Sequence, residues 1–197
     1  MSPRKVRMLL ILAVVFFTSF THAQFSAEIL ELQKPDTPTQ KLYFANNKMR
    51  IEWPDHDGKK GTVLIADFAT QTVTFLIVER HTYTEMPMSA RSQVRYGFFL
   101  ASDVENACHD WQEIAHGQKG SCHKLGIGMV NGRKTVEYEG TNLRGEVGQF
   151  WLDRALRFPV KWQSEVSSGE LRNIQEGAQP ASLFDVPPGF GRTDPSH

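Results

Sequence analysis

The stretch Lys41–Trp53, which reads KLYFANNKMRIEW, decides the fold class of this chain. Its second part, Lys48–Trp53, alternates apolar and charged side chains, and this alternation is typical of a half-buried β-strand. Its first part, Lys41–Ala45, is another run that suits a strand, and Asn46-Asn47 between the two suits a tight turn. The stretch therefore predicts two antiparallel strands joined by a short turn.

Similar runs recur along most of the chain. They are rich in Val, Ile, Leu, Phe and Thr, which suit a pleated surface, and turn signals such as Asn131-Gly132 separate them. Further strands are expected at Phe25–Gln33, Thr62–Asp67, Thr72–Glu79, His81–Glu85, Leu125–Val130, Lys134–Glu139, Glu146–Leu152, Leu156–Val166 and Glu170–Gln175. Regular hairpin spacing favours an antiparallel meander over βαβ units. The predicted fold class is mainly β (α+β), with about ten strands in one large curved antiparallel sheet.

Residues 90–116 interrupt the strand pattern and predict a helix. Ser102 followed by Glu105 fits a capping box, and Gly117 suits the helix end. Apolar residues follow the cap at helical spacing: Val104, Cys108, Trp111 and Ile114. The preceding segment, Gln93–Leu100, suits either a helical turn or a second helix.

The first 23 residues have the order of an export signal. Met1–Arg7 is basic, Met8–Phe20 is a 13-residue apolar run, and Thr21-His22-Ala23 places small residues at the −3 and −1 positions. Such a run spans only ~20 Å as a helix, less than the ~30 Å hydrocarbon core of a membrane. We therefore expect cleavage after Ala23, no transmembrane anchor, and a soluble mature chain, Gln24–His197, in a bacterial periplasm.

Composition excludes further classes of function. The chain has 22 basic and 22 acidic side chains, and the export signal holds three of the basic ones and no acid. Nineteen basic against 22 acidic groups remain, a net charge of −3, with no basic excess to neutralise nucleic-acid phosphates. We expect one domain at residues 24–190, with a helical turn at Pro180–Phe184, and a flexible tail at residues 191–197.

Cys108 and Cys122 are the two cysteines of the chain. An isolated pair in an oxidising compartment most often forms a disulfide, which is our expectation. The neighbouring His109, His116 and His123 leave a zinc or copper site as one alternative, although their spacing matches no common zinc pattern. Free or redox-active thiols are the other alternative.

Catalytic motifs are missing from the sequence. Neither Gly-x-Ser-x-Gly nor His-Glu-x-x-His occurs, and the seven histidines are scattered. A Ser-His-Asp triad is not constrained by sequence spacing, but no feature favours one. We expect no enzymatic activity, no cofactor and no metal.

Two of the expected strands are apolar on both sides. Val63–Phe68 and Val73–Val78 leave neither face of their strand polar. Such strands need cover on both faces, from helices or from a bound apolar ligand. A curved sheet with the central helix across its open face provides such cover.

The order of seven segments is more specific than any one of them. The segments are Tyr43–Trp53, Val63–Asp67, Arg80–Pro87, Cys122–Tyr138, Trp151–Asp153, Phe158–Lys161 and Gln179–Gly189. In this order they resemble the LolA/LolB-like fold of envelope lipoprotein-carrier proteins, and in particular an uncharacterised family of exported bacterial proteins that share this fold. The resemblance implies a half-open β-barrel whose helical lid closes an apolar cavity. In the carriers, that cavity holds the acyl chains of lipoproteins in transit. This chain differs from the LolB branch because it has no lipidated N-terminal Cys.

Candidate residues for lining the cavity or its lid follow from the resemblance and the apolar pattern. They are Met49, Arg50, Ile51, Trp53, Phe75, Phe98, Trp111, Trp151 and Trp162. Core packing is the alternative role for each Trp. Arg50 either points inward, toward the lid or the polar end of a ligand, or faces water.

These expectations give one leading hypothesis and one alternative. The leading hypothesis is a soluble, non-catalytic periplasmic binding protein that holds an acyl chain, a lipid or a lipidated protein. The alternative is an envelope interaction module that binds a protein partner through its sheet and has no small-molecule ligand.

Overall fold

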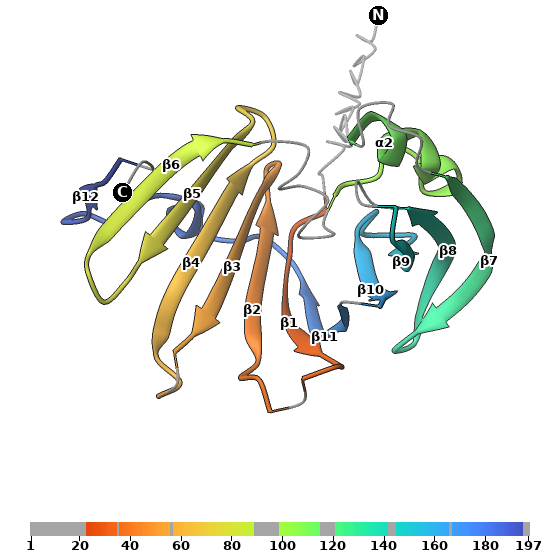
Figure 1. Ribbon diagram of the computed structural model, residues 1–197, viewed down its shortest axis with the longest axis horizontal. Coiled ribbons are helices and arrows are strands. Elements are labelled where there is room, and N and C mark those ends of the chain that lie inside the picture. Colours follow the sequence, from red (N-terminus) through yellow and green to blue (C-terminus); the bar gives the residue numbers. More distant parts are fainter. Residues whose placement is uncertain are drawn as a thin grey trace, which may run out of the picture.

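The computed structural model describes residues 23–34, 36–55, 57–88, 99–114, 121–141, 145–165 and 167–194. They form one 12-stranded sheet in the order β12-β6-β5-β4-β3-β2-β1-β11-β10-β9-β8-β7, which Figure 1 shows as a continuous curved surface. The strands are β1 Phe25–Glu31, β2 Gln40–Ala45, β3 Lys48–Pro54, β4 Lys60–Asp67, β5 Thr72–Ile77, β6 Thr82–Pro87, β7 Cys122–Val130, β8 Arg133–Thr141, β9 Val147–Asp153, β10 Pro159–Ser164, β11 Ser168–Glu176 and β12 Gly191–Arg192. The helical segments are η1 Val104–Asn106, α2 Ala107–Ile114 and η2 Ala181–Phe184.

The predicted fold class is confirmed. Neighbouring strands pair antiparallel, apart from β12 and β6, which are parallel. The sheet is open and curved, with the short helix α2 above the ends of β7, β8 and β9 (Figure 1). None of the helices in the described part of the chain is long and apolar enough to cross a membrane.

Strands β2–β5 carry buried side chains on both faces of the sheet. One face carries Phe44 on β2 and Ile51 on β3, and we call it the helix face because strand register makes it continuous with the face on which α2 packs. The opposite face carries Ala45 and Ile65, and we call it the C-terminal face because the end of the chain covers it. Val63–Ala66 on β4 is buried throughout, as expected for a strand covered on both sides.

Three phenylalanines pack at the centre of the helix face. Phe25 on β1, Phe44 on β2 and Phe158 from the turn before β10 are all fully buried. Their ring centroids are 5.8 Å (Phe25–Phe44), 5.3 Å (Phe25–Phe158) and 5.4 Å (Phe44–Phe158) apart. Aromatic pairs at such distances add about 0.5–1.5 kcal/mol each beyond the burial of their area. The turn between β9 and β10 therefore folds across the sheet and packs against β1 and β2, which are not neighbours of β9 or β10 in the sheet order.

This turn corrects the strand predicted at Leu156–Val166. The buried carboxylate of Asp153 accepts the backbone N–H groups of Ala155 and Leu156, each at 2.8 Å, and Arg157 has a φ of +57°. N–H groups that are hydrogen-bonded to a side chain do not pair with a neighbouring strand, and a left-handed residue bends the backbone. The strand β10 therefore begins only at Pro159. Leu156 is buried because the turn packs on the sheet and not because it lies in a strand.

The helix α2 and the segment that leads into it together cover part of the helix face. Phe99, Ala101 and Val104 pack with Trp111 against the helix face of β8 and β9. The guanidinium of Arg157 donates to the carbonyl oxygen of Ala101 at 2.7 Å and also to that of Ser102. The β9–β10 turn thus fixes the segment that leads into the helix.

The start of the helix differs from the predicted capping box. The cap is Asp103, whose carboxylate accepts the N–H of Glu105 at 2.9 Å. Ser102 instead donates its hydroxyl to Asp110 at 2.6 Å. A capping box needs its Glu side chain to return to the cap, and here cations on β7 and on the β9–β10 turn hold Glu105 away from it.

Buried hydrogen bonds attach α2 to the sheet. The hydroxyl of Tyr138 on β8 donates to the carbonyl of Val104 at 2.7 Å and accepts the N–H of Ala107 at 3.3 Å. The indole N–H of Trp111 donates to the carbonyl of Thr141 at 3.1 Å. Each bond satisfies a polar group that would otherwise be costly to bury.

An ion-pair group adds a link at the surface. Glu105 contacts Lys124 on β7 at 2.5 Å and also Arg154 in the β9–β10 turn. The hydrogen bond from Lys124 lowers the pKa of Glu105 from its ordinary value of 4.5. A lowered pKa in the folded state means that this link is complete above pH 4.5 and is lost as the pH falls through the lowered pKa.

The expected disulfide is confirmed. Cys108 on α2 bonds to Cys122 at the start of β7, with the two Cα atoms 5.4 Å apart and a sequence separation of 14. The same pairing excludes a metal site or free thiols at these two residues. The helix is therefore fixed to the sheet by a covalent bond as well as by polar contacts.

The end of the chain corrects the predicted flexible tail. A helical turn was expected at Pro180–Phe184, and η2 forms there. Phe184, the last residue of η2, packs on the C-terminal face with Val63 and Leu76. Gly191–Arg192 then forms β12, and the N–H of Thr193 donates to Tyr83 on β6 at 2.8 Å. Figure 1 shows this segment passing behind the sheet from β11 to the edge at β12. The domain thus includes at least residues 191–193, and backbone pairing with β6 is the reason.

We expect the double substitution Cys108→Ser, Cys122→Ser to lower the free energy of unfolding by ~3 kcal/mol, because the open loop regains conformational entropy in the unfolded chain. Urea denaturation followed by circular dichroism measures the change. The wild-type protein under a strong reductant is the control, and it should lose a similar amount. An unchanged denaturation midpoint would show that the disulfide does not hold the helix.

Candidate functional site

The helix face of β3–β6 brings together four of the residues singled out from the sequence. Met49, Ile51 and Trp53 share this face of β3, and Phe75 lies on β5, two strands away, opposite Leu64 of β4. Met49 and Ile51 are fully buried, whereas Trp53 and Phe75 are half-buried. The face thus changes from a packed centre to a partly exposed margin.

We call the partly exposed margin the apolar rim. It consists of Trp53, Phe68, Phe75 and Met86, all half-buried and all packed against the buried core of the helix face. Phe68 and Met86 were not singled out as site residues from the sequence. Met86 could have been found from its strand register, which places it opposite Val73 on the same face. The rim offers aromatic rings and a flexible thioether, which suit contact with an apolar ligand.

Trp162 lies on the helix face of β10, across the sheet from the apolar rim. Its ring covers Gly169 of β11, where an added Cβ would lie 2.4 Å from Cζ2 of the ring and 2.9 Å from the carbonyl oxygen of Leu30. Its indole N–H donates to the hydroxyl of Ser167 at 3.2 Å. Because Gly169 has no side chain, the Trp162 ring can occupy the space above it.

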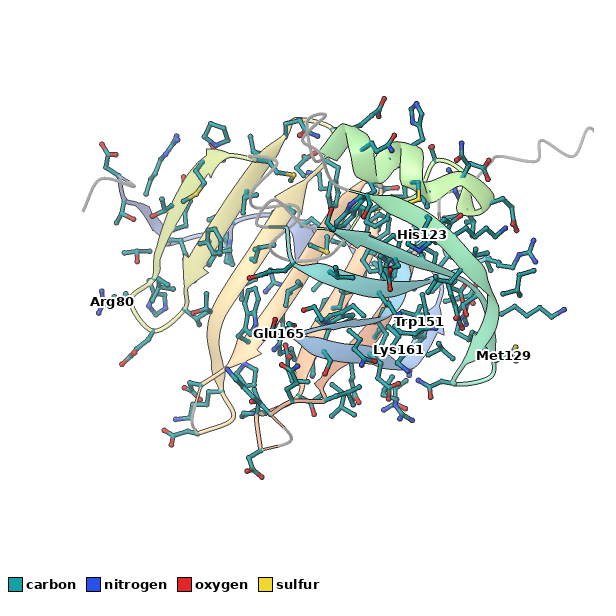
Figure 2. The ribbon with its side chains drawn as sticks, turned by 45° about the vertical axis from the view of Figure 1, so that its right-hand side comes forward. Arg80, His123, Met129, Trp151, Lys161 and Glu165 are labelled. Atoms are coloured by element: carbon teal, nitrogen blue, oxygen red, sulfur yellow. A yellow bond between two sulfur atoms is a disulfide. The ribbon has the colours of Figure 1, made fainter. Side chains whose placement is uncertain are left out.

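Trp111 and Trp151 have other surroundings. Trp111 is buried between α2 and the sheet, with its ring centroid 5.5 Å from that of Phe150, as in core packing. Trp151 on β9 faces Lys161 on β10, whose Nζ atom lies 4.5 Å from the ring centroid; Figure 2 shows these two side chains side by side. A cation over an aromatic face is attracted by the ring quadrupole. Phe98 lies outside the described residues.

Arg50 is buried on the C-terminal face, opposite to Met49 and Ile51. Its Nε atom lies 2.8 Å from a carboxylate oxygen of Glu52, and its Nη1 atom donates to the carbonyl of Leu183 in η2 at 2.8 Å. The expectation that it faces water is wrong, because η2 covers this part of the sheet. Arg50 does hydrogen-bond a covering segment, but that segment is the end of the chain and lies on the face away from the apolar rim.

Few side chains offer a place for a metal. Within the described part of the chain, His109, Asp110 and Glu113 place ligand atoms within 4.8 Å of one another. The carboxylate of Asp110 already accepts the backbone N–H and the hydroxyl of Ser102, at 2.7 and 2.6 Å. His109 and Glu113 are exposed, so this group is explained as a solvated helix surface.

Comparison with known proteins gives a likeness of fold alone. No protein-family model and no curated protein matches the sequence. Among solved structures, the chain is similar to an uncharacterized conserved protein from Thermus thermophilus, with a TM-score of 0.57 and 6% identity, over 88% of this chain and 91% of that one. It is also similar to PNGF-II, with a TM-score of 0.55 and 10% identity, over 87% of this chain and 31% of that longer chain.

A looser match is a putative outer membrane lipoprotein-sorting protein domain from Vibrio parahaemolyticus, with a TM-score of 0.34 and 13% identity, over 82% of this chain and 87% of that one. The architecture of one open, curved antiparallel sheet with a short helix agrees with the LolA/LolB-like fold that the sequence resembles. At these identities, neither a ligand nor an activity follows from the likeness.

We expect Gly169→Ala to lower the free energy of unfolding by about 1–3 kcal/mol, because the new methyl group displaces the Trp162 ring and meets a backbone oxygen. Chemical denaturation measures this change. Gly191→Ala is the matched control, since nothing lies within 4 Å of its added Cβ. Equal stability of the two variants would contradict the placement of Trp162.

The Arg50–Glu52 pair gives a second prediction. Arg50→Met should lower the free energy of unfolding by about 3–5 kcal/mol, because it leaves the Glu52 carboxylate buried without this cation. Adding Glu52→Leu should recover much of the loss, since the buried carboxylate is then removed as well. Thermal and urea denaturation measure both variants.

The exposed pair Arg192–Glu85 is the control for the buried one. Arg192→Met should change the free energy of unfolding by less than about 1 kcal/mol. A double variant as unstable as Arg50→Met alone would show that the buried charge is not the cause.

Proposed function

We propose that this protein is a non-catalytic binding protein of the bacterial periplasm that holds an acyl chain, free or as part of a lipid or a lipidated protein, against the apolar rim. The observation that carries the proposal is the graded exposure of the helix face. Its centre is fully packed by Phe25, Phe44 and Phe158, while Trp53 and Phe75 beside it remain partly open to solvent.

The composition of the rim supports an apolar ligand. Trp53, Phe68, Phe75 and Met86 present rings and a thioether, and the residue opposite Phe75 on β6 is the neutral Thr84. Each methylene group that a ligand buries there contributes about 0.8 kcal/mol. The affinity should therefore grow with the length of the ligand's acyl chain and should not depend on a particular head group.

The proposal assigns α2 the role of a fixed wall. A disulfide, the Tyr138 hydroxyl and the Trp111 indole all join α2 to β7 and β8. Moving the helix away from the sheet would break the hydrogen bonds of the Tyr138 hydroxyl and the Trp111 indole, and the disulfide restricts such movement. Uptake and release are therefore expected without displacement of α2, in contrast to a carrier whose helical lid opens.

The test is binding of dansyl-labelled undecanoic acid to the exported protein, followed by the blue shift and increase of dansyl emission. The wild type should bind saturably, and Phe75→Asn and Met86→Asn should each weaken binding by about ten-fold, because they remove apolar area from the rim. Val147→Asn is the matched control, since Val147 is an exposed apolar residue on β9, away from the rim. It should bind as the wild type does.

Native mass spectrometry of protein taken directly from the periplasm gives an independent readout. A bound mass that lipid extraction removes is the expected result. The absence of both saturable dansyl binding and any extractable lipid would contradict the proposal, provided that circular dichroism shows folded protein.

A further inference from the structure

Strand β7 forms one edge of the sheet and carries a row of exposed apolar side chains. Leu125, Ile127 and Met129 are 45%, 64% and 62% exposed. Ile127 lies opposite the buried Val136 of β8, so the row occupies the helix face beyond the part that α2 covers. Figure 2 shows Met129 at the outer margin of the molecule. Large apolar side chains in a row on an open edge are unusual in a protein that acts alone.

The two edges of the sheet differ in how their outer strands are paired. At the other edge, β12 pairs with β6, and the N–H groups of Gly191 and Thr193 donate to the carbonyls of His81 and Tyr83, both at 2.8 Å. Beyond β7, no strand pairs within the described residues.

Edge strands usually carry Lys, Pro or a bulge that blocks pairing. On β7, a register shift lies between Lys124 and Gly126, and Lys124 itself is ion-paired with Glu105. The following residues, Leu125–Val130, contain no charge and no proline. The far part of the strand therefore has no feature that prevents another strand from adding to it.

The backbone of this part is oriented for such pairing. Val130 and Arg133 flank the two-residue turn Asn131-Gly132, whose φ angles are 49° and 80°. Residues that flank such a turn form a hydrogen-bonded pair, and hydrogen bonding alternates along an antiparallel ladder. Ile127 and Met129 therefore direct their N–H and C=O groups away from β8, toward the open edge.

We propose that a second copy of this chain pairs along β7, antiparallel and related by a two-fold axis, with Ile127 of one copy opposite Ile127 of the other. This inference does not depend on the proposed ligand. It would join two sheets into one through residues that already point outward.

The strand is complementary to itself in this register. Leu125 lies opposite Met129 of the second copy, so six apolar side chains gather on one face, and Gly126 lies opposite Gly128 on the other. Lys124 lies opposite Val130, so no like charges meet. An unrelated partner strand would need to supply the same apolar alternation, whereas a second copy has it by construction.

The size of the contact sets the expected strength. One strand pair with six side chains is at the small end of specific interfaces, which begin near about 1,200 Å². We therefore expect a reversible dimer that dissociates in the micromolar range. Its population should depend strongly on protein concentration.

Sedimentation velocity of the exported protein over a range of micromolar concentrations tests the proposal. The wild type should move from monomer to dimer, and Ile127→Lys should weaken the dimer at least about ten-fold because two ammonium groups would meet at the axis. Val147→Lys, a charge at another exposed apolar position, should leave the dimer unchanged. A wild type that is monomeric throughout, or a dimer that Ile127→Lys does not weaken, would overturn the proposal.

A second experiment tests the register. Opposite residues of a hydrogen-bonded pair have Cα atoms about 5.5 Å apart, within the range of a disulfide. Ile127→Cys should therefore form a covalent dimer under oxidising conditions, seen on a non-reducing gel, while Met129→Cys, which faces Leu125, should not. Cross-linking through Met129→Cys but not Ile127→Cys, or through neither, would overturn this arrangement, including the case in which another protein occupies the edge.

Discussion

The constraint on which this structure depends is that one chain must cover both faces of an apolar sheet. Strands β2–β5 place large apolar side chains on each face, and burying them stabilises the fold only if other segments remove them from water. On the helix face, the β9–β10 turn supplies Phe158 and Leu156. On the C-terminal face, the residues after β11 supply Leu183, Phe184 and Phe190. The curved sheet, the position of the helix and the path of the chain end all follow from this need.

Covering segments bring their own polar groups into buried places, and specific donors satisfy them. Arg157 donates to the carbonyl of Ala101, Arg50 to that of Leu183, and Tyr138 to that of Val104. In each case a side chain fixed in the sheet or in a turn binds the backbone of the segment above it. Such bonds give little net free energy when formed but cost much when broken, so they select one arrangement of the cover.

The proposed function and the proposed dimer use what the cover leaves exposed. The apolar rim remains half-buried because the phenylalanine cluster fills only the centre of the helix face. The β7 edge remains open because the chain end reaches the opposite edge, at β6, and pairs there. Since the rim and β7 lie at different ends of the strand order, binding a ligand and pairing with a second copy are compatible.

The sequence by itself determined most of the local structure. Alternation in Lys48–Trp53 and the Asn-Gly turn after Val130 predicted hairpins correctly, because period and turn chemistry depend only on neighbouring residues. The disulfide was predictable because only two cysteines are present. Tertiary structure alone decided that Leu156 lies in a turn, that Asp103 caps the helix and that Arg50 is buried beneath η2. Each of these three features depends on a partner that is remote in sequence or on competition for a hydrogen bond. Neither kind of interaction produces a periodic pattern in the sequence.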